Sequence, residues 1–170
     1  GIGIPFLDSE ICLSEGDFGE IMCKTKYTKG RYLGENQLFV DEKGFFATGD
    51  CARRDKNGII YFVSRKKSII NYNGQKIIPH EVEDLLNLRE EVDECVVVKE
   101  LGLDTEVAIC YIKKCMPVSR DRFVEYLLKY LESYKIPRRF YLVEALPKTV
   151  SGKIIRNNSA YLNITKMELV

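Results

Sequence analysis

Two Asn-Gly pairs constrain the fold of this chain more than any other feature of its sequence. Asn57-Gly58 directly precedes the β-branched and aromatic run 59–63, and Asn73-Gly74 lies between the apolar runs 69–72 and 76–78. Both residue types tolerate the positive φ that tight hairpin turns require. We therefore predict two β-hairpins, the first within a β-rich, turn-rich opening segment that contains no helix.

The periodicity changes after residue 67. Pro79 is predicted to open a helix, because its missing N–H costs nothing in the first turn. Val82, Leu85, Leu86 and Arg89 follow at helical spacing, and acidic residues near the helix start suit the helix dipole. The hairpins thus give way to a helical segment.

A second helix is predicted after Ser119, a good N-cap residue, and Pro137 blocks its continuation. Its apolar stripe consists of Phe123, Tyr126, Leu127, Tyr130 and Leu131. The runs 95–98, 107–112 and 140–143 are typical of strands, with a loop at 102–104 after the first. The predicted class is α+β: a β-rich segment over residues 1–67, followed by a compact α+β domain over residues 68–170.

Composition limits the classes of partner. The chain has 170 residues and 45% hydrophobic content, enough for one ordinary domain or two small ones with a buried core. Its 26 basic and 25 acidic residues leave a net charge of +1, so we expect no general affinity for nucleic acid or a membrane surface. The start of the chain lacks a signal-peptide pattern, and no apolar run could span a bilayer. We expect a cytoplasmic protein.

The cysteine pattern argues against a zinc site. No two of the six cysteines are spaced C-x-x-C, and the only histidine is His80. We expect reduced, mostly buried cysteines and no bound metal. The cysteines are Cys12, Cys23, Cys51, Cys95, Cys110 and Cys115.

Asp50 and Arg65 have side chains suited to a nucleotide, although each has a plainer interpretation. Asp50 follows Thr48-Gly49 in a turn, where a carboxylate can accept hydrogen bonds from a ribose diol or can simply cap the turn. The planar fork of Arg65 can bridge ribose oxygens or a phosphate, or can be solvated. The neighbouring Lys66 is interpreted as a solvated cation.

Two loops have the composition of substrate-facing loops. Gly74 lets the backbone approach a ligand closely, although it is equally a plain hairpin residue. Lys153 follows Gly152 in the segment LPKTVSGKIIR, residues 146–156, and a flexible loop there can carry an ammonium into a neighbouring site. Ser-Gly-Lys alone is more often a surface loop, and the phosphate-loop spacing is absent.

The motifs occur in an order that resembles the C-terminal portion of the acyl-adenylate-forming superfamily, which includes acyl-CoA synthetases, luciferases and peptide-synthetase adenylation domains. The resemblance covers almost the whole chain. Its motifs are Gly19-Glu20-Ile21 with Gly30-Arg31-Tyr32, then Thr48-Gly49-Asp50, then SRKKSIINYNGQKIIPHEVE at 64–83, and then LPKTVSGKIIR at 146–156.

The resemblance implies that residues 1–67 are the β-rich end of a large N-terminal domain and that residues 68–170 are its C-terminal lid. The enzyme would use ATP and Mg²⁺ to convert a carboxylic acid to an acyl-adenylate. It would then transfer the acyl group to the thiol of CoA by domain alternation. The implied roles are catalysis by Lys153, nucleotide binding by Asp50 and Arg65, a hinge at Lys67, and a pantetheine-facing loop at Asn73 and Gly74.

Other matching positions are assigned to structure. Glu81 and Glu83 match the family's Glu-Val-Glu, and His80 is interpreted as a surface or capping residue. Arg156 is either structural or faces a phosphate. Lys67 departs from the aspartate that many relatives carry at the hinge, although luciferase-like members have lysine.

Several alternatives stay open. The family's phosphate loop and its adenine- and magnesium-binding segment would precede Gly1, so we expect an excised domain or a split subunit that needs the missing N-terminal domain and is inactive alone. The acceptor can be CoA, which we favour, or a phosphopantetheine carrier protein, as in peptide-synthetase or D-alanine-carrier-ligase types. A non-catalytic partner subunit of a split ligase, or an unrelated α+β domain, would also fit parts of the pattern.

Overall fold

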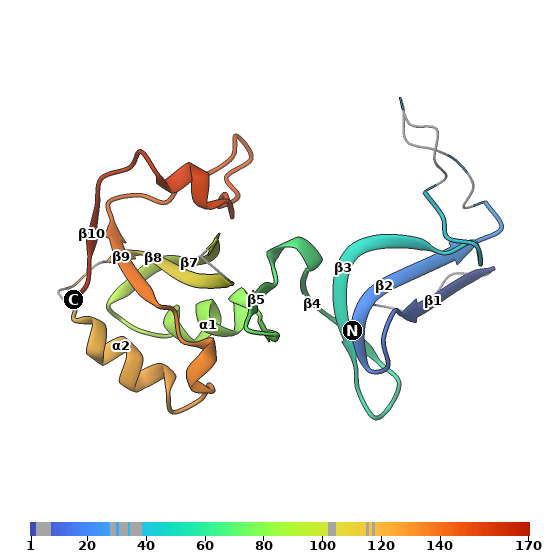
Figure 1. Cartoon of the computed structure of the whole chain (residues 1–170), viewed down its shortest axis with the longest axis horizontal. Coiled ribbons are helices and arrows are strands. Elements are labelled where there is room, and N and C mark those ends of the chain that lie inside the picture. Colours follow the sequence, from blue (N-terminus) through green and yellow to red (C-terminus); the bar gives the residue numbers. More distant parts are fainter. Residues whose placement is uncertain are drawn as a thin grey trace. The chain divides into compact units, whose positions relative to one another are not determined.

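A computed structural model describes residues 1–2, 8–27, 30, 34, 39–101, 105–114, 116 and 118–170. The chain divides into two compact units, Gly1–Lys67 and Ser68–Val170 (Figure 1). Arg31 and Tyr32 of the family-like stretch, the predicted loop at 102–104, and Cys115 lie outside the described residues.

The first unit is built on one antiparallel sheet of four strands in the order β1-β2-β3-β4. The strands are β1 (Ser9–Leu13), β2 (Phe18–Thr25), β3 (Phe46–Arg54) and β4 (Ile60–Arg65). Its small core contains Leu13, Ile21 and Ala52. The predicted hairpin between β3 and β4 is confirmed: Gly58 has φ of 81° and its N–H donates to the Asp55 carbonyl at 2.9 Å.

The second unit follows a short 3₁₀ helix, η1 (Lys66–Ser68). Its elements are β5 (Ile70–Tyr72), β6 (Gln75–Ile77), α1 (Pro79–Leu86), β7 (Val92–Leu101), β8 (Glu106–Lys114), α2 (Arg120–Leu127), η2 (Ser133–Lys135), β9 (Arg139–Val143), η3 (Asn158–Tyr161) and β10 (Lys166–Glu168). Strands β5 and β6 form the second predicted hairpin. The main sheet has the order β10-β9-β8-β7, in which β8 and β9 are parallel and the other pairs are antiparallel.

Alternating side chains of this sheet enter two separate cores. One face packs against α1 and α2, and that core includes Val82, Leu86, Val97, Phe123 and Phe140. On the other face the ring of Tyr111 stacks on Tyr161 of η3, with centroids 4.2 Å apart. Figure 1 shows the helices on one side of the sheet and the C-terminal segment on the other. The unit is therefore three-layered, and the predicted α+β class is confirmed.

Both predicted helices are shorter than their apolar stripes. Helix α1 ends at Leu86, because the Leu88 and Arg89 N–H groups donate to carbonyls only three residues back. Arg89 is therefore not on the helix. A helix that tightens in this way satisfies its last carbonyls within the final turn.

Helix α2 ends at Leu127 for the same reason, since the Lys129 and Tyr130 N–H groups donate to Tyr126 and Leu127. Tyr130, which belongs to the predicted apolar stripe, lies beyond the end of the helix and is 62% exposed. Ser119 occupies the N-cap position, but its side chain makes no capping hydrogen bond.

Within the described ranges, Cys51, Cys95 and Cys110 are buried, Cys12 and Cys23 are half-buried, and all five are free thiols. No helix of the described chain is long and apolar enough to cross a membrane. The described residues also contain no group of three or more His, Cys, Asp and Glu side chains that could hold a metal ion.

Candidate functional site

Asp50 and Arg65 lie opposite each other on β3 and β4. The strand register pairs them directly, and Arg65 Nε lies 2.9 Å from Asp50 Oδ1. Gly49, with φ of 76°, makes the bend before Asp50, whose N–H donates to Thr48 Oγ1 at 3.1 Å. The structure thus brings together two residues whose sequence positions are distant, and the guanidinium orients a half-buried carboxylate.

Glu20 supports this arrangement from β2, a role that the sequence analysis missed. It is only 8% exposed; Oε1 accepts the Gly49 N–H and Oε2 accepts Lys66 Nζ, both at 2.8 Å. The hydrogen bond to Glu20 raises the pKa of Lys66. Lys66 is exposed, as expected of a solvated cation, and the structure adds a partner for its ammonium in Glu20. A glutamate next to the buried Ile21 of a strand is the one sequence signal that could have revealed the pair.

Lys67 is exposed and is the last residue of the first unit. Directly before it, Lys66 is held by Glu20, and shortly after it Ile69 and Ile70 are buried in the second unit. Only Lys67 and the half-buried Ser68 lie between these two fixed points. The backbone torsions of a segment this short would have to absorb any rotation between the units.

Asn73 and Gly74 form the turn between β5 and β6, with φ of 48° and 81°. The Asn73 N–H donates to Thr105 Oγ1, which in turn donates to the Asn71 carbonyl, both at 2.9 Å. The Asn71 N–H donates to Glu106 Oε2 at 2.8 Å. A Cβ added at Gly74 would meet no heavy atom within 4 Å, so the tip of this braced hairpin faces open space.

Lys153 ends a hydrogen-bonded turn rather than a loose loop. The Gly152 N–H donates to the Thr149 carbonyl at 2.9 Å, the Thr149 N–H donates to the Lys153 carbonyl at 2.8 Å, and Lys148 bridges to Ile154. The Lys153 side chain is exposed, and none of the described acidic residues lies within ion-pair distance of its ammonium. The turn therefore presents an unneutralised cation on an ordered stem.

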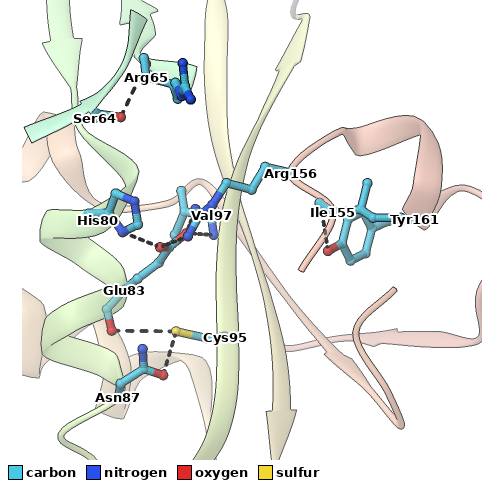
Figure 2. A network of polar contacts seen from close by, with 10 residues as sticks. All are labelled: Ser64, Arg65, His80, Glu83, Asn87, Cys95, Val97, Ile155, Arg156 and Tyr161. Carbon is cyan, nitrogen blue, oxygen red and sulfur yellow. Dashed lines mark hydrogen bonds and ion pairs between the residues drawn. The ribbon is translucent and has the colours of Figure 1, made fainter. Parts of the chain in front are cut away.

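Arg156, just beyond this turn, is bound to Glu83 of α1 (Figure 2). Nη1 and Nη2 of Arg156 lie 2.5 and 2.8 Å from the two carboxylate oxygens, and His80 Nδ1 lies 3.2 Å from Oε2. The Val97 N–H donates to Oε1 at 2.7 Å. Burial alone would raise the pKa of Glu83, but the hydrogen bonds from His80, Arg156 and Val97 outweigh it and lower that pKa.

This network engages Arg156 within the second unit, since two of its nitrogens are committed to one carboxylate. Glu83 is 3% exposed and can remain ionised only because each oxygen has donors. Glu81 points to a different partner, with Lys135 Nζ at 2.9 Å. The structural assignment of both glutamates agrees with these contacts.

Residues 81–153 match the model of the AMP-binding enzyme C-terminal domain. The chain is 34% identical over 167 residues to a 2-succinylbenzoate–CoA ligase of Oceanobacillus iheyensis, covering 92% of this chain and 34% of that protein. It is 31% identical over 161 residues to a 4-coumarate–CoA ligase of Pinus taeda, covering 91% of this chain and 30% of that protein. The chain belongs to the acyl-adenylate-forming superfamily.

Solved structures of this superfamily have the same fold. The o-succinylbenzoate CoA synthetase of Bacillus subtilis, in complex with its acyl-adenylate intermediate, matches with a TM-score of 0.82 and 28% identity, over 98% of this chain and 36% of that one. The same enzyme with ATP and a magnesium ion matches with a TM-score of 0.72 and 28% identity, over 91% and 34%. The chain spans about a third of the length of these superfamily members.

Proposed function

We propose that this chain is the C-terminal part of an ATP-dependent ligase that joins a carboxylic acid to a thiol through an acyl-adenylate. The observation that carries the proposal is the Lys153 ammonium, which is exposed, unneutralised by described acidic residues and mounted on an ordered turn. The first unit would be the end of the large domain, and the second unit would be the lid.

In the first half-reaction, a carboxylate oxygen attacks the α-phosphorus of ATP, and pyrophosphate leaves with the electrons of the broken P–O bond. Two anions must approach each other, so a cation placed between them lowers the barrier. Lys153 supplies that cation. Asp50, oriented by Arg65, accepts hydrogen bonds from the ribose diol. Mg²⁺ would accompany the triphosphate, a proposal supported by the B. subtilis relative solved in complex with ATP and a magnesium ion.

In the second half-reaction, a thiol gives up its proton and attacks the acyl carbon, and AMP leaves with the electrons of the broken C–O bond. The lid would rotate about Lys67, which removes Lys153 and presents the Asn73-Gly74 turn to the pantetheine arm. The ion pair of Lys66 with Glu20 and the burial of Ile69 and Ile70 support a pivot confined to residues 67 and 68.

CoA is the acceptor that we propose. The relatives that match the chain over most of its length are named as CoA ligases, which favours CoA over a carrier protein. The acid is a carboxylic acid of unassigned structure, because relatives named for 2-succinylbenzoate and 4-coumarate match at similar identities.

The test is ATP–pyrophosphate exchange with a panel of carboxylic acids. The full-length protein should exchange pyrophosphate with at least one acid and, when CoA is added, release AMP and an acyl-CoA. The isolated 170 residues should show no exchange, because a lid cation without the triphosphate site has nothing to act on. Exchange by the isolated chain would contradict the proposal that the triphosphate site lies in the large domain outside these residues. If a thioester formed only with a phosphopantetheine carrier protein, the acceptor would be that protein and not CoA.

Replacing Asp50 by alanine in the full-length protein should raise the KM for ATP in the exchange reaction by about 10- to 100-fold, the worth of charge-assisted hydrogen bonds to one ligand. Asp55→Ala is the matched control, since the Asp55 carboxylate accepts the Asn57 and Ile59 N–H groups of its own turn, both at 2.9 Å, and these are its hydrogen bonds among the described residues. An equal rise in KM for both variants would show that Asp50 only caps its turn.

A further inference from the structure

The two loops assigned to the two half-reactions are held by two separate polar anchors, both inside the second unit. The Lys153 turn is tied to α1 by the contact of Arg156 with Glu83. The Asn73-Gly74 turn is tied to the start of β8 by Thr105 and Glu106. The two anchors share no residue, so each can be altered without the other.

The first anchor fixes the orientation of the Lys153 stem. Arg156 follows Lys153 after only Ile154 and Ile155, and the Ile155 N–H donates to the Pro147 carbonyl at 2.9 Å on the opposite side of the stem. The Ile155 carbonyl accepts the Tyr161 hydroxyl at 2.7 Å, as Figure 2 shows. A short stem tied on both sides transmits the orientation of Arg156 to Lys153.

The chemistry of the Glu83 contact suits positioning better than stability. A buried ion pair loses in desolvation much of what it gains in attraction, so apolar residues of similar volume often stabilise a fold equally well. A bidentate contact between guanidinium and carboxylate, in contrast, permits one relative orientation of the two planes. The Val97 N–H and His80 hold the carboxylate itself in place, so the plane presented to Arg156 is also defined.

The second anchor also lies entirely within the second unit. Thr105 Oγ1 accepts the Asn73 N–H and donates to the Asn71 carbonyl, both on the β5 side of the hairpin. Glu106 accepts the Asn71 N–H, and its other oxygen pairs with Lys99 Nζ at 2.9 Å. These bonds orient the backbone of the hairpin and leave its tip exposed.

We propose that Glu83 and Arg156 are positioning residues for acyl-adenylate formation, acting through Lys153, and that Thr105 is a positioning residue for thioester formation, acting through the Asn73-Gly74 turn. Neither anchor touches the reactants. The inference rests on the proposed function and adds that each half-reaction has its own geometric control within the lid.

The experiment compares Arg156→Lys and Thr105→Val in the full-length ligase. Arg156→Lys keeps the charge but loses the bidentate fork, and should slow acyl-adenylate formation by about 10- to 100-fold, as expected for a small misplacement of a catalytic group. Its KM for ATP and its rate of thioester formation from supplied acyl-adenylate should stay unchanged. Thr105→Val should show the reverse pattern, with slower thioester formation and normal adenylate formation.

Combining variants separates positioning from general damage. If Arg156 acts through Lys153, adding Arg156→Lys to Lys153→Ala should cause no further loss of adenylate formation, because residues that act as a unit are not additive. A merely structural role would add its loss to that of Lys153→Ala and would slow both half-reactions. Additive losses in the double variant, or slowing of both half-reactions by Arg156→Lys alone, would overturn the inference.

Two further outcomes are covered. Should Arg156→Lys fail to fold, Glu83→Asp retains the buried charge but shortens its reach, and the same half-reaction pattern is expected of it. Should Lys153→Ala leave adenylate formation intact, the proposed function itself fails. If Lys153→Ala is impaired and both anchor variants are normal, only the positioning inference fails.

Discussion

Replacing Lys153 by alanine in the full-length ligase is expected to slow acyl-adenylate formation by about 100- to 1,000-fold, the range measured when one preorganised electrostatic donor is removed from an active site. Thioester formation from supplied acyl-adenylate should be spared, because the proposed rotation of the lid withdraws the ammonium in that step. The measurement is a single-turnover assay of each half-reaction. The effect should lie in the rate constant more than in the KM for ATP, since the cation acts on the developing transition state.

Lys148 offers a matched control on the same stem. Its ammonium lies 2.6 Å from Glu94 Oε1 and is therefore already neutralised within the second unit. Lys148→Ala removes one partly exposed ion pair, and should leave both half-reactions close to normal. Equal loss of both half-reactions in Lys153→Ala would contradict the assignment of Lys153 to the first step alone.

Replacing Glu83 by alanine is expected to have the largest effect on stability, lowering the free energy of unfolding by about 3–5 kcal/mol, as found when one partner of a buried ion pair is removed. The variant leaves the Arg156 guanidinium without its carboxylate and the buried Val97 N–H without an acceptor. Urea unfolding of the 170-residue chain would measure the change. Glu81→Ala is the control: its pair with Lys135 is more exposed and should contribute about 1 kcal/mol or less.

The loss of stability in Glu83→Ala should also depend on pH, and the pKa of Glu83 fixes the direction of that dependence. The pKa of Glu83 in the folded chain lies below its ordinary value of 4.5. A lowered pKa contributes stability that is fully present above the unfolded value and is lost as the pH falls through the folded value. The difference in unfolding free energy between the wild-type chain and Glu83→Ala should therefore be constant near neutral pH and narrow below about pH 4.5. A difference that widens in acid would show that the carboxylate is not stabilised in its ionised form.

Local features of the sequence were predicted well, because they depend on residues next to one another. The Asn57-Gly58 and Asn73-Gly74 turns, the start of α1 at Pro79 and the strand before Arg65 need only backbone preferences to be predicted. The helix ends were predicted poorly. Apolar spacing continues past Leu86 and Leu127, but the chain tightens there into three-residue hydrogen bonds as it leaves the core.

The sequence by itself determined the α+β class, the hairpins, the superfamily pattern and the choice of Lys153 as the candidate catalytic cation. Only the tertiary structure decided which polar groups meet. Glu83 pairs with Arg156, Glu20 binds Lys66 and the Gly49 N–H, and Thr105 binds the Asn73 turn. The physical reason is that turns and strands follow from local backbone preferences. The partner of a charged side chain is instead set by how the sheet and helices bring distant segments together, and no short-range pattern records it.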